Sequence, residues 1–411
     1  MIQLRSRGPV FDVLDGSGTP ILKDCSAAVV LGDGRRIVAG DTGTPIQAAL
    51  RWDRPGANQL LLQLDLENHG NAPVAIERLE ILSCPAGLCQ APIDRLGVMQ
   101  TGWESWSYAA APDAFRANGA ALEAPVIGPL GAPVGAEGVL VPWVSIIRTD
   151  AGRGMLAGFT SAMRYLGAIE IEPAVNGHSL RAANYVEGTT LDAGARGSSE
   201  PLLLALDGPD SLLLDSYAGA VGQTMQARVP GHIPTGWCSW YYFYLDVTEG
   251  DCLRNIDALA TQRELRPIDY VQIDDGYERA VGDWLTCNPN FPRGMGFLAD
   301  AIHERAFQAG IWLAPFLLSA QSDTYAAHPD WVVRTPAGEP LNAIDNWGSA
   351  NYALDTTHPE ALAWLRNVLE VMTLEWGFDY LKIDFLFAGA LRGKRFEPNV
   401  TSVEAYRRGL A

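Results

Sequence analysis

The feature that most constrains the fold is a change of pattern at residues 229–234, Val-Pro-Gly-His-Ile-Pro. After this segment, short apolar runs alternate with helical patterns, which is typical of βα units around a parallel sheet. The expected strands are residues 235–244, 270–275, 310–316 and 378–384. The expected helices are residues 248–263, residues 295–309, one beginning near residue 359 with a capping box of Thr357 and Glu360, and residues 401–410.

This second part of the chain is short for a closed barrel. Eight βα units take about 250 residues, more than the stretch 231–411 provides. We therefore expect residues 231–411 to form the first half of a (β/α)8 barrel, about its first four βα units. The sequence is accordingly predicted to be part of a longer chain.

Residues 1–230 follow a different pattern, in which short alternating strands are separated by Gly, Pro, Asn and Asp. Long helical patterns are absent, so a β-sandwich domain is predicted. At 411 residues the chain exceeds what one core usually supports, which also favours two domains. The clearest strand candidates are residues 60–66, 74–81, 139–147, 154–159 and 202–206.

Charged side chains stand at the ends of two predicted strands. Lys382 and Asp384 alternate to the same face of the fourth strand, at the carboxyl end where barrel enzymes place their chemistry. Asp274 and Asp275 follow the second strand and are suited to accept hydrogen bonds from neighbouring sugar hydroxyls. The alternatives are a plain ion pair for Lys382 and Asp384, and a solvated loop or a metal site for the paired acids.

Aromatic residues form a second group of candidates. Trp312 lies within the third strand, where its ring could face the C–H side of a sugar or pack in the core. Tyr241 closes the first expected strand among other aromatic residues. Trp103 belongs to an aromatic cluster in the polar segment Gly-Trp-Glu-Ser-Trp-Ser-Tyr, which marks either a binding surface or a plug between domains.

The chemistry of a retaining glycosidase gives Asp384 a role. Such enzymes need an ionised carboxylate as nucleophile and a second carboxyl group about 5–5.5 Å away as acid/base. A lysine beside Asp384 favours the ionised form, whereas the same pairing raises the pKa of Lys382 and disfavours a Schiff-base lysine. No second carboxylate after Asp384 stands at a strand end, because Glu397 and Glu404 lie in a turn and a helix start.

Overall charge and composition limit the partners. The net charge of −18 repels nucleic acid and anionic membranes and suits a neutral substrate such as a sugar. The N-terminus lacks the apolar segment of a secretory signal, and no apolar run is long enough to span a bilayer. We expect a cytoplasmic protein with reduced thiols and without a zinc site, since Cys84 and Cys89 are the only close pair among Cys25, Cys84, Cys89, Cys238, Cys252 and Cys287.

From Thr235 onward, the motifs together resemble the α-galactosidases of glycoside hydrolase family 36, the melibiase-like group of clan D. The resemblance rests on several ordered motifs, namely Gly-Trp-Cys-Ser-Trp-Tyr at 236–241, Gln-Ile-Asp-Asp-Gly-Tyr-Glu at 272–278, Gly-Asp-Trp at 282–284, Gly-Ile-Trp-Leu-Ala-Pro-Phe at 310–316, Ser-Asp at 322–323, His-Pro-Asp-Trp-Val at 328–332, Tyr-Ala-Leu-Asp at 352–355 and Lys-Ile-Asp-Phe-Leu-Phe-Ala-Gly-Ala at 382–390. It implies a β-sandwich followed by a (β/α)8 barrel and a small C-terminal sheet domain, and a retaining double displacement on terminal α-galactosyl residues without metal or cofactor.

The resemblance also implies roles for individual residues. Asp384 falls on the family's nucleophile, and Asp274 and Asp275 fall on the pair that binds the galactose O4 and O6 hydroxyls. Lys382 matches the family's sugar-contacting lysine. Trp312 and Tyr241 match aromatics that line the pocket, and Trp103 matches an aromatic that the sandwich domain lends to it.

The sequence departs from the family at its C-terminal end. The family's acid/base aspartate follows a motif of the Arg-Ile-Gly-Pro-Asp type after the sixth strand, and neither that motif nor the C-terminal sheet domain occurs here. The chain by itself is therefore expected to be nearly inactive. Open alternatives are galactosyl transfer, an α-N-acetylgalactosaminide substrate and a non-catalytic sugar-binding fragment. Analogy with compact family members suggests a homo-oligomer that acts on an α-galactoside oligosaccharide.

Overall fold

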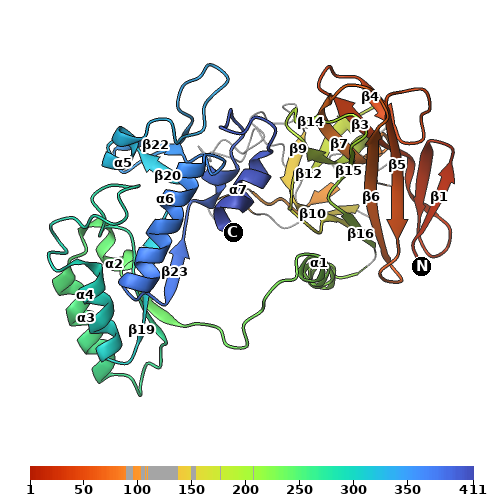
Figure 1. Ribbon diagram of the computed structural model, residues 1–411. Helices are drawn as coiled ribbons and strands as arrows, with labels where there is room; N and C mark the ends of the chain where they lie inside the picture. Colours follow the sequence, from red (N-terminus) through yellow and green to blue (C-terminus); the bar gives the residue numbers. More distant parts are fainter. Residues whose placement is uncertain are drawn as a thin grey trace. The chain divides into compact units, whose positions relative to one another are not determined.

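The computed structural model describes residues 1–88, 96–102, 107, 109, 138–149, 154–175, 177–206 and 208–411. The chain forms two compact units (Figure 1). The first unit comprises Met1–Arg228 and Asn399–Glu404, and the second comprises Val229–Pro398 and Ala405–Ala411. No helix among the described residues is both long enough and apolar enough to cross a membrane.

The described part of the first unit contains two antiparallel sheets. The larger sheet has the order β1 (Gln3–Arg7), β2 (Val10–Leu14), β3 (Pro20–Leu31), β7 (Val74–Cys84), β13 (Gly177–Tyr185), β12 (Leu166–Ala174) and β9 (Val139–Pro142), with β4 (Arg36–Val38) on β3 and β14 (Thr190–Leu191) on β7. The second sheet has the order β15 (Arg196–Ser198), β6 (Gln59–Asn68), β16 (Leu202–Leu206), β11 (Gly154–Phe159), β10 (Val144–Thr149) and β8 (Leu96–Val98), with β5 (Ile46–Asp53) on β6.

The two sheets share one core, because each strand buries alternate side chains. In β6, Leu60, Leu62, Leu64 and Leu66 are buried while the residues between them are partly exposed. These leucines belong to the same apolar cluster as residues of the larger sheet such as Ile81. The alternation of apolar and polar residues, from which the strands were predicted, therefore also identifies the side chains that are buried. The prediction of a β-sandwich is confirmed.

Residues 139–147 do not form the single strand that their apolar run predicts. The run is divided at Trp143, whose φ of 65° is left-handed, into β9 and β10. β9 pairs with β12 in the larger sheet, whereas β10 pairs with β11 in the second sheet. The chain thus changes sheets at Trp143, directly after Pro142, and hydrophobic periodicity gives no signal for such a crossing.

The expectation that this part lacks a long helix is wrong. Helix α1 (Asp210–Thr224) follows β16, and Figure 1 shows it end-on. Its apolar stripe is weak, with Leu213 as its one buried residue. The helix is held by packing on the second sheet, where the hydroxyl of Tyr217 donates a hydrogen bond to the carbonyl oxygen of Phe159 at 2.7 Å. Such tertiary contacts outweigh a weak local pattern.

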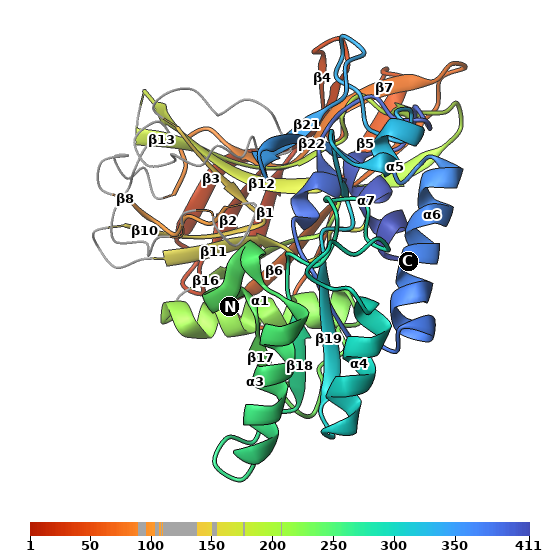
Figure 2. The same ribbon diagram turned by 90° about the vertical axis from the view of Figure 1, so that its left-hand side faces the viewer.

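The second unit contains a parallel sheet of four described strands in the order β17 (Gly236–Cys238), β18 (Tyr270–Ile273), β19 (Gln308–Leu313) and β23 (Tyr380–Ile383). The order in space equals the order in the chain, as it does along a βα barrel. Helices α3 (Glu249–Thr261), α4 (Gly294–Glu304) and α6 (Pro359–Glu370) lie between successive strands in the sequence (Figure 2), and α7 (Ser402–Leu410) follows the last strand.

The first predicted strand, residues 235–244, is mostly not a strand. Only β17 pairs with β18, and residues Trp240–Phe243 form helix α2, followed by a single turn of 3-10 helix at Tyr244–Asp246. Because β18 is itself only four residues long, the aromatic run after Cys238 has no partner strand. This run is therefore helical in spite of its high strand propensity.

Two helix boundaries also differ from expectation. Helix α4 ends at Glu304, and Ala306 with its φ of 58° turns the chain into β19. The predicted capping box at residue 357 is absent, since the Thr357 hydroxyl instead donates to Asp355 Oδ1 at 2.7 Å. His358 occupies the N-cap of α6 without a side-chain cap bond.

A small antiparallel sheet that the sequence pattern did not predict lies between β19 and α6 in the chain. It has the order β20 (Leu317–Ser319), β22 (Ser349–Ala353) and β21 (Asn342–Asn346), and the short helix α5 (Asp323–Ala327) follows β20. The turn between β21 and β22 carries Trp347, which has a φ of 53°. This turn matters for the site described below.

A buried carboxylate in the first unit provides a test of the fold. Glu80 in β7 accepts hydrogen bonds from Arg36 and Arg78, each at 2.7 Å, and Arg181 lies 3.4 Å away. Burial by itself raises the pKa of Glu80, but the arginines outweigh burial, so the pKa lies below its usual value of 4.5.

We expect Glu80→Gln to lower the free energy of unfolding by about 2–3 kcal/mol, because three guanidinium groups lose their buried anion. The wild type should have the higher free energy of unfolding at pH values above the unfolded pKa of about 4.5. This difference should disappear as the pH falls through the lower native pKa of Glu80. Urea unfolding at several pH values measures both effects. Glu67→Gln, which removes a surface pair with Arg196, should cost less than about 1 kcal/mol; equal losses in the two variants would contradict a stabilising role for the buried Glu80 charge.

Candidate active site

The parallel sheet brings together charged residues from two strands that are not neighbours. Asp274 and Asp275 follow β18, Lys382 is in β23, and Asp384 directly follows β23. Because parallel strands point the same way, all four residues stand at the carboxyl edge of the sheet. Lys382 Nζ lies 2.7 Å from Asp274 Oδ2, although β19 separates the two strands.

The register explains how the lysine crosses β19. Lys382 stands opposite Trp312, and Asp274 lies one step beyond the pair of Ile273 with Ile311. Asp274, Trp312 and Lys382 therefore form one row across three strands. Asp274 and Trp312 are buried, while the lysine side chain is 30% exposed.

Lys382 pairs with Asp274 and not with its sequence neighbour Asp384, which corrects the expected pairing. Burial alone lowers the pKa of Lys382, but the hydrogen bond and charge of Asp274 outweigh it, and Asp384 adds a smaller contribution. The pKa of Lys382 is consequently raised. A lysine that stays charged is a poor Schiff-base nucleophile and a good hydrogen-bond donor.

Both carboxylate oxygens of Asp384 accept hydrogen bonds from rigid donors. The indole Nε1–H of Trp312 donates to Asp384 Oδ2 at 3.1 Å, and the backbone N–H of Phe385 donates to Oδ1 at 2.9 Å. Phe385 has a left-handed φ of 53°, an uncommon conformation for a bulky residue. These contacts fix the plane of the Asp384 carboxylate.

Asp274 is held by neutral donors as well as by the lysine. The side chain of Gln272 donates to Asp274 Oδ2 at 2.5 Å, and the thiol of Cys238 lies 3.3 Å from the same oxygen. The backbone N–H of Asp274 donates to Ser239 Oγ at 2.9 Å. Sequence reasoning assigned no role to Gln272 or Ser239, although Gln272 stands two residues before Asp274 and so shares its face of the strand.

Trp347 is a site residue that sequence reasoning missed. Its indole Nε1–H donates to Asp275 Oδ2 at 2.8 Å. Its ring lies 6.3 Å from the ring of Trp312 and 5.0 Å from that of Phe385, measured between centroids. The residue is far from Asp275 in sequence, and only the unpredicted turn between β21 and β22 brings it there.

The Trp312 ring is enclosed by other aromatic rings. Trp284 packs edge-on against it at 5.7 Å, and the ring of Phe385 lies 6.4 Å away. The side chain of Trp312 is only 1% exposed. In this structure its indole orients Asp384. The sequence left open whether its ring faces a sugar or packs in the core.

Glu278 adds a fourth carboxyl group to the cluster. It is 7% exposed and accepts a hydrogen bond from the backbone N–H of Gly276 at 3.3 Å. Burial, reinforced by the charge of Asp275, raises the pKa of Glu278 well above its usual value. Burial also raises the pKa of Asp275, an effect that Trp347 partly opposes. Two neighbouring buried carboxyl groups do not both ionise readily, so we expect Glu278 and Asp275 to share a proton.

The remaining predicted residues are not joined to this cluster. Tyr241 lies in α2 with 77% of its surface exposed, and no ring contact or hydrogen bond among the described residues links it to the acids. Trp103 lies outside the described residues. Within the described ranges, no group of three or more His, Cys, Asp and Glu side chains is placed to hold a metal ion.

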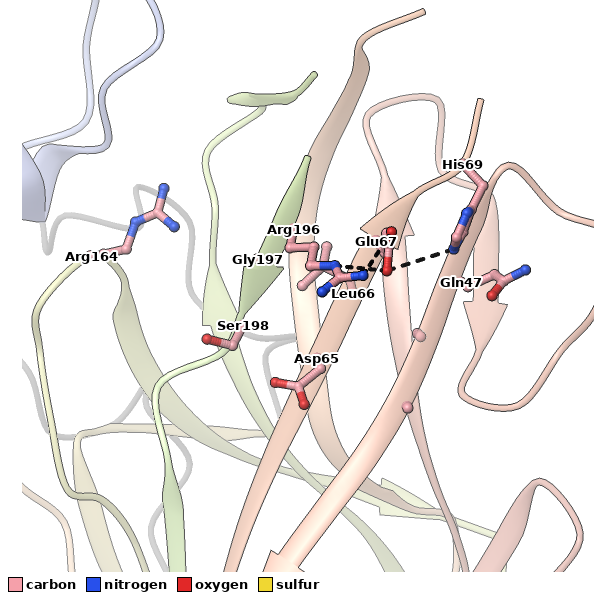
Figure 3. A pocket seen from close by; sticks show the side chains of 11 residues that line it. Gln47, Asp65, Leu66, Glu67, His69, Arg164, Arg196, Gly197 and Ser198 are labelled. Atoms are coloured by element: carbon pink, nitrogen blue, oxygen red, sulfur yellow. Dashed lines mark hydrogen bonds and ion pairs between the residues drawn. The ribbon is translucent and has the colours of Figure 1, made fainter. Parts of the chain in front are cut away.

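A separate hollow of about 650 Å³ lies in the first unit (Figure 3). It is formed by β5, β6 and β15, and its polar lining includes Asp65, Glu67 and Arg196. Arg196 pairs with Glu67 at 2.9 Å, and His69 Nε2 lies 3.8 Å from the same carboxylate. Since Glu67 already pairs with Arg196 and Asp65 with Arg51, this hollow offers weaker chemistry for a substrate than the strand-end cluster.

The site is thus a compact set of acids with one fixed lysine at the edge of a parallel sheet, an arrangement suited to binding hydroxyl groups.

Comparison with known proteins agrees. The melibiase family model matches residues 234–389. α-Galactosidase AgaA of Geobacillus stearothermophilus is 31% identical over 153 residues, which are 36% of this chain and 20% of that protein. α-Galactosidase Mel36A of Lactobacillus acidophilus is 31% identical over 109 residues, 25% of this chain and 14% of that protein.

Solved structures extend the similarity along the chain. The α-galactosidase of Thermus thermophilus in complex with stachyose is 30% identical, with a TM-score of 0.61, and covers 88% of this chain and 70% of its own. The AgaA structure has a TM-score of 0.64 at 16% identity, covering all of this chain and 61% of its own. The chain belongs to the α-galactosidases of glycoside hydrolase family 36. Its aligned part spans no more than a fifth of the two curated relatives named above.

The ion pair across β19 predicts a stability loss in the second unit. We expect Lys382→Met to lower the free energy of unfolding by about 1–3 kcal/mol, because Asp274 keeps its buried charge without a cation. Lys394→Met is the matched control, since the exposed Lys394 ammonium donates only to the carbonyl oxygen of Pro336. Calorimetry measures the unfolding transition of both variants. If Lys382→Met loses no more stability than Lys394→Met, the inferred burial of the Asp274 charge is contradicted.

The shared proton predicts a pH effect with a definite sign. A carboxyl group with a raised native pKa contributes stability below its unfolded pKa of about 4.5 that is lost as the pH rises toward the native value. Glu278→Gln keeps a neutral donor beside Asp275 and should remove much of this loss. The stability of the variant should therefore fall less than that of the wild type as the pH rises above the unfolded pKa. Glu304→Gln, at a carboxylate whose side chain is 71% exposed, should keep the wild-type slope, and an unchanged slope in Glu278→Gln would refute the shared proton.

Proposed function

We propose that the chain carries the nucleophile and the galactose-binding residues of a retaining α-galactosidase, which hydrolyses terminal α-galactosyl residues by double displacement. The single observation that carries this proposal is the Asp384 carboxylate, held through both oxygens beside the pair Asp274 and Asp275 at one sheet edge. A nucleophile must be aimed at the anomeric carbon, and the donors from Trp312 and Phe385 hold the Asp384 carboxylate in one orientation.

In the proposed first step, an Asp384 oxygen attacks the anomeric carbon of galactose. The bond from that carbon to the leaving oxygen breaks, and the leaving oxygen takes a proton from a second carboxyl group. Water then attacks the same carbon, the second carboxylate takes a proton from the water, the bond to Asp384 breaks, and galactose is released. Because each displacement inverts the anomeric centre, the product keeps the α configuration.

Asp274 and Asp275 accept hydrogen bonds from galactose hydroxyl groups in this proposal. The free N–H bonds of Lys382 donate to a hydroxyl while its contact with Asp274 Oδ2 at 2.7 Å keeps it in place. Charge-assisted hydrogen bonds of this kind are stronger than neutral ones. Support for an oligosaccharide substrate comes from the Thermus thermophilus relative, whose structures hold stachyose and p-nitrophenyl α-D-galactopyranoside.

We place the acid/base residue outside these 411 residues. Among the described residues that follow β23, Glu397 forms an ion pair with Arg408 at 2.7 Å and Glu404 pairs with Arg164. The four parallel strands would then be about the first four βα units of a closed barrel that the whole protein completes. Since a general acid contributes about 10²–10⁴-fold, the isolated chain should turn over aryl galactosides only slowly.

The nucleophile is tested in the whole protein. We expect Asp384→Ala to lower hydrolysis of p-nitrophenyl α-D-galactopyranoside at least about a thousandfold, because no covalent intermediate can form. Asp330→Ala is the control, since the side chain of Asp330 is 68% exposed. Unchanged turnover in Asp384→Ala would remove the assignment and leave a non-catalytic sugar-binding role. Wild-type-like turnover by the 411-residue chain alone would show that the acid lies within it.

A second candidate function is removal of an N-acetylated or amino galactose. It is favoured by one relative, the A type blood α-D-galactosamine galactosaminidase of Flavonifractor plautii, which is 28% identical over 174 residues. Comparing the whole protein on galactosides and on α-N-acetylgalactosaminides distinguishes the two. Adding sucrose as an acceptor tests galactosyl transfer in the same assay.

A further inference from the structure

Two cysteines that are far apart in the sequence lie opposite each other in the first unit. Cys25 is in β3 and Cys84 is the last residue of β7. The antiparallel ladder ends at the pair of Ser26 with Ser83, and Cys25 and Cys84 are the residues next to that pair on the two strands. Directly opposed residues point to the same face of a sheet and have their Cα atoms about 4.5–5.5 Å apart.

The surroundings of the two thiols agree with this placement. Cys25 is 0% and Cys84 1% exposed, and neither forms a disulfide. Both sulfur atoms lie near one backbone carbonyl oxygen, that of Lys23, with Cys84 Sγ at 3.2 Å and Cys25 Sγ at 3.8 Å. The two reduced thiols are therefore buried close together, in two neighbouring central strands of the sheet.

We propose that Cys25 and Cys84 form a redox modification site, at which a small two-electron oxidant links β3 and β7 by a cross-strand disulfide. The Cα separation of an opposed pair falls within the range of about 4.4–6.8 Å that disulfides span. The site requires no part of the proposed glycosidase chemistry, because both residues lie in the first unit. It joins residues that are far apart in the sequence, unlike Cys84 and Cys89, the only close pair of cysteines.

Cys84 is the better nucleophile of the two. The neighbouring Cys25 thiol lowers the pKa of Cys84, although burial opposes this effect. The Cys84 thiol and burial raise the pKa of Cys25. The thiolate is the reactive form of cysteine, so Cys84 should react first and Cys25 should complete the disulfide.

The reaction balances with an azodicarboxamide such as diamide. The Cys84 thiolate adds to one nitrogen of the N=N bond, and the other nitrogen takes a proton. Cys25 sulfur then displaces the nitrogen from Cys84, which forms the S–S bond. The two electrons and two protons lost by the thiols convert N=N to a hydrazine. With a small disulfide as the oxidant, two exchange steps release two small thiols instead.

Peptide mapping tests the proposal directly. The 411-residue protein is treated with diamide, denatured, alkylated and digested without reductant. The expected result is a Cys25–Cys84 linked peptide, with the six thiols of the chain reduced to four. A Cys84–Cys89 link, a link between two chains, or full alkylation of both residues would each overturn the proposal.

Two variants provide a matched comparison. Cys252→Ser alters a cysteine that is equally buried, at 0% exposure, in helix α3, and should leave the linked peptide unchanged. Cys25→Ser should abolish it without creating another. Should Cys25→Ser fold poorly, the wild-type protein still decides, because oxidation should raise its urea midpoint and a reductant should reverse the rise. A midpoint that stays unchanged while the linked peptide is present would overturn the claim that the bond joins strands paired in the native sheet.

Discussion

The contact on which the site depends is the ion pair that Lys382 makes with Asp274 across the intervening strand β19. A buried carboxylate is costly unless a cation and further donors accompany it. Asp274 has the lysine, the Gln272 amide and the Cys238 thiol around one oxygen. This pair ties the ends of β18 and β23 together, and the other acids are arranged around it.

The charge balance of the cluster explains the roles of the other residues. Four carboxyl groups and one ammonium lie at this edge, so full ionisation would leave an excess of buried negative charge. The raised pKa of Glu278 relieves this excess, because it favours the protonated form of Glu278 beside Asp275. Asp384 is instead supported by neutral donors, the Trp312 indole and the Phe385 amide. The cluster thereby keeps one carboxylate oriented without a direct cationic partner.

Much of the site was predictable because parallel strands place their carboxyl ends together. The patterns that mark β18, β19 and β23 put Asp274, Asp275, Trp312, Lys382 and Asp384 near one edge before any coordinates are known. The details were not predictable, because they depend on the register between strands. Register sets Lys382 in a row with Asp274, whereas adjacency in the sequence suggested Asp384 as its partner. Trp347 is supplied by a turn of the small sheet and gives no local signal.

The sequence by itself determined the two kinds of secondary structure, the place where one gives way to the other, and the strands that bear the acids. It could do so because burial imposes periods of two and of about 3.6 residues that are visible in any single segment. The tertiary structure alone decided that the chain crosses between sheets at Trp143 and that residues 240–243 are helical. It also decided that Lys382 forms its ion pair with Asp274, and that the Cys25 and Cys84 thiols lie near the same carbonyl oxygen. Each of these depends on a partner that is distant in the sequence, and local periodicity carries no information about such partners.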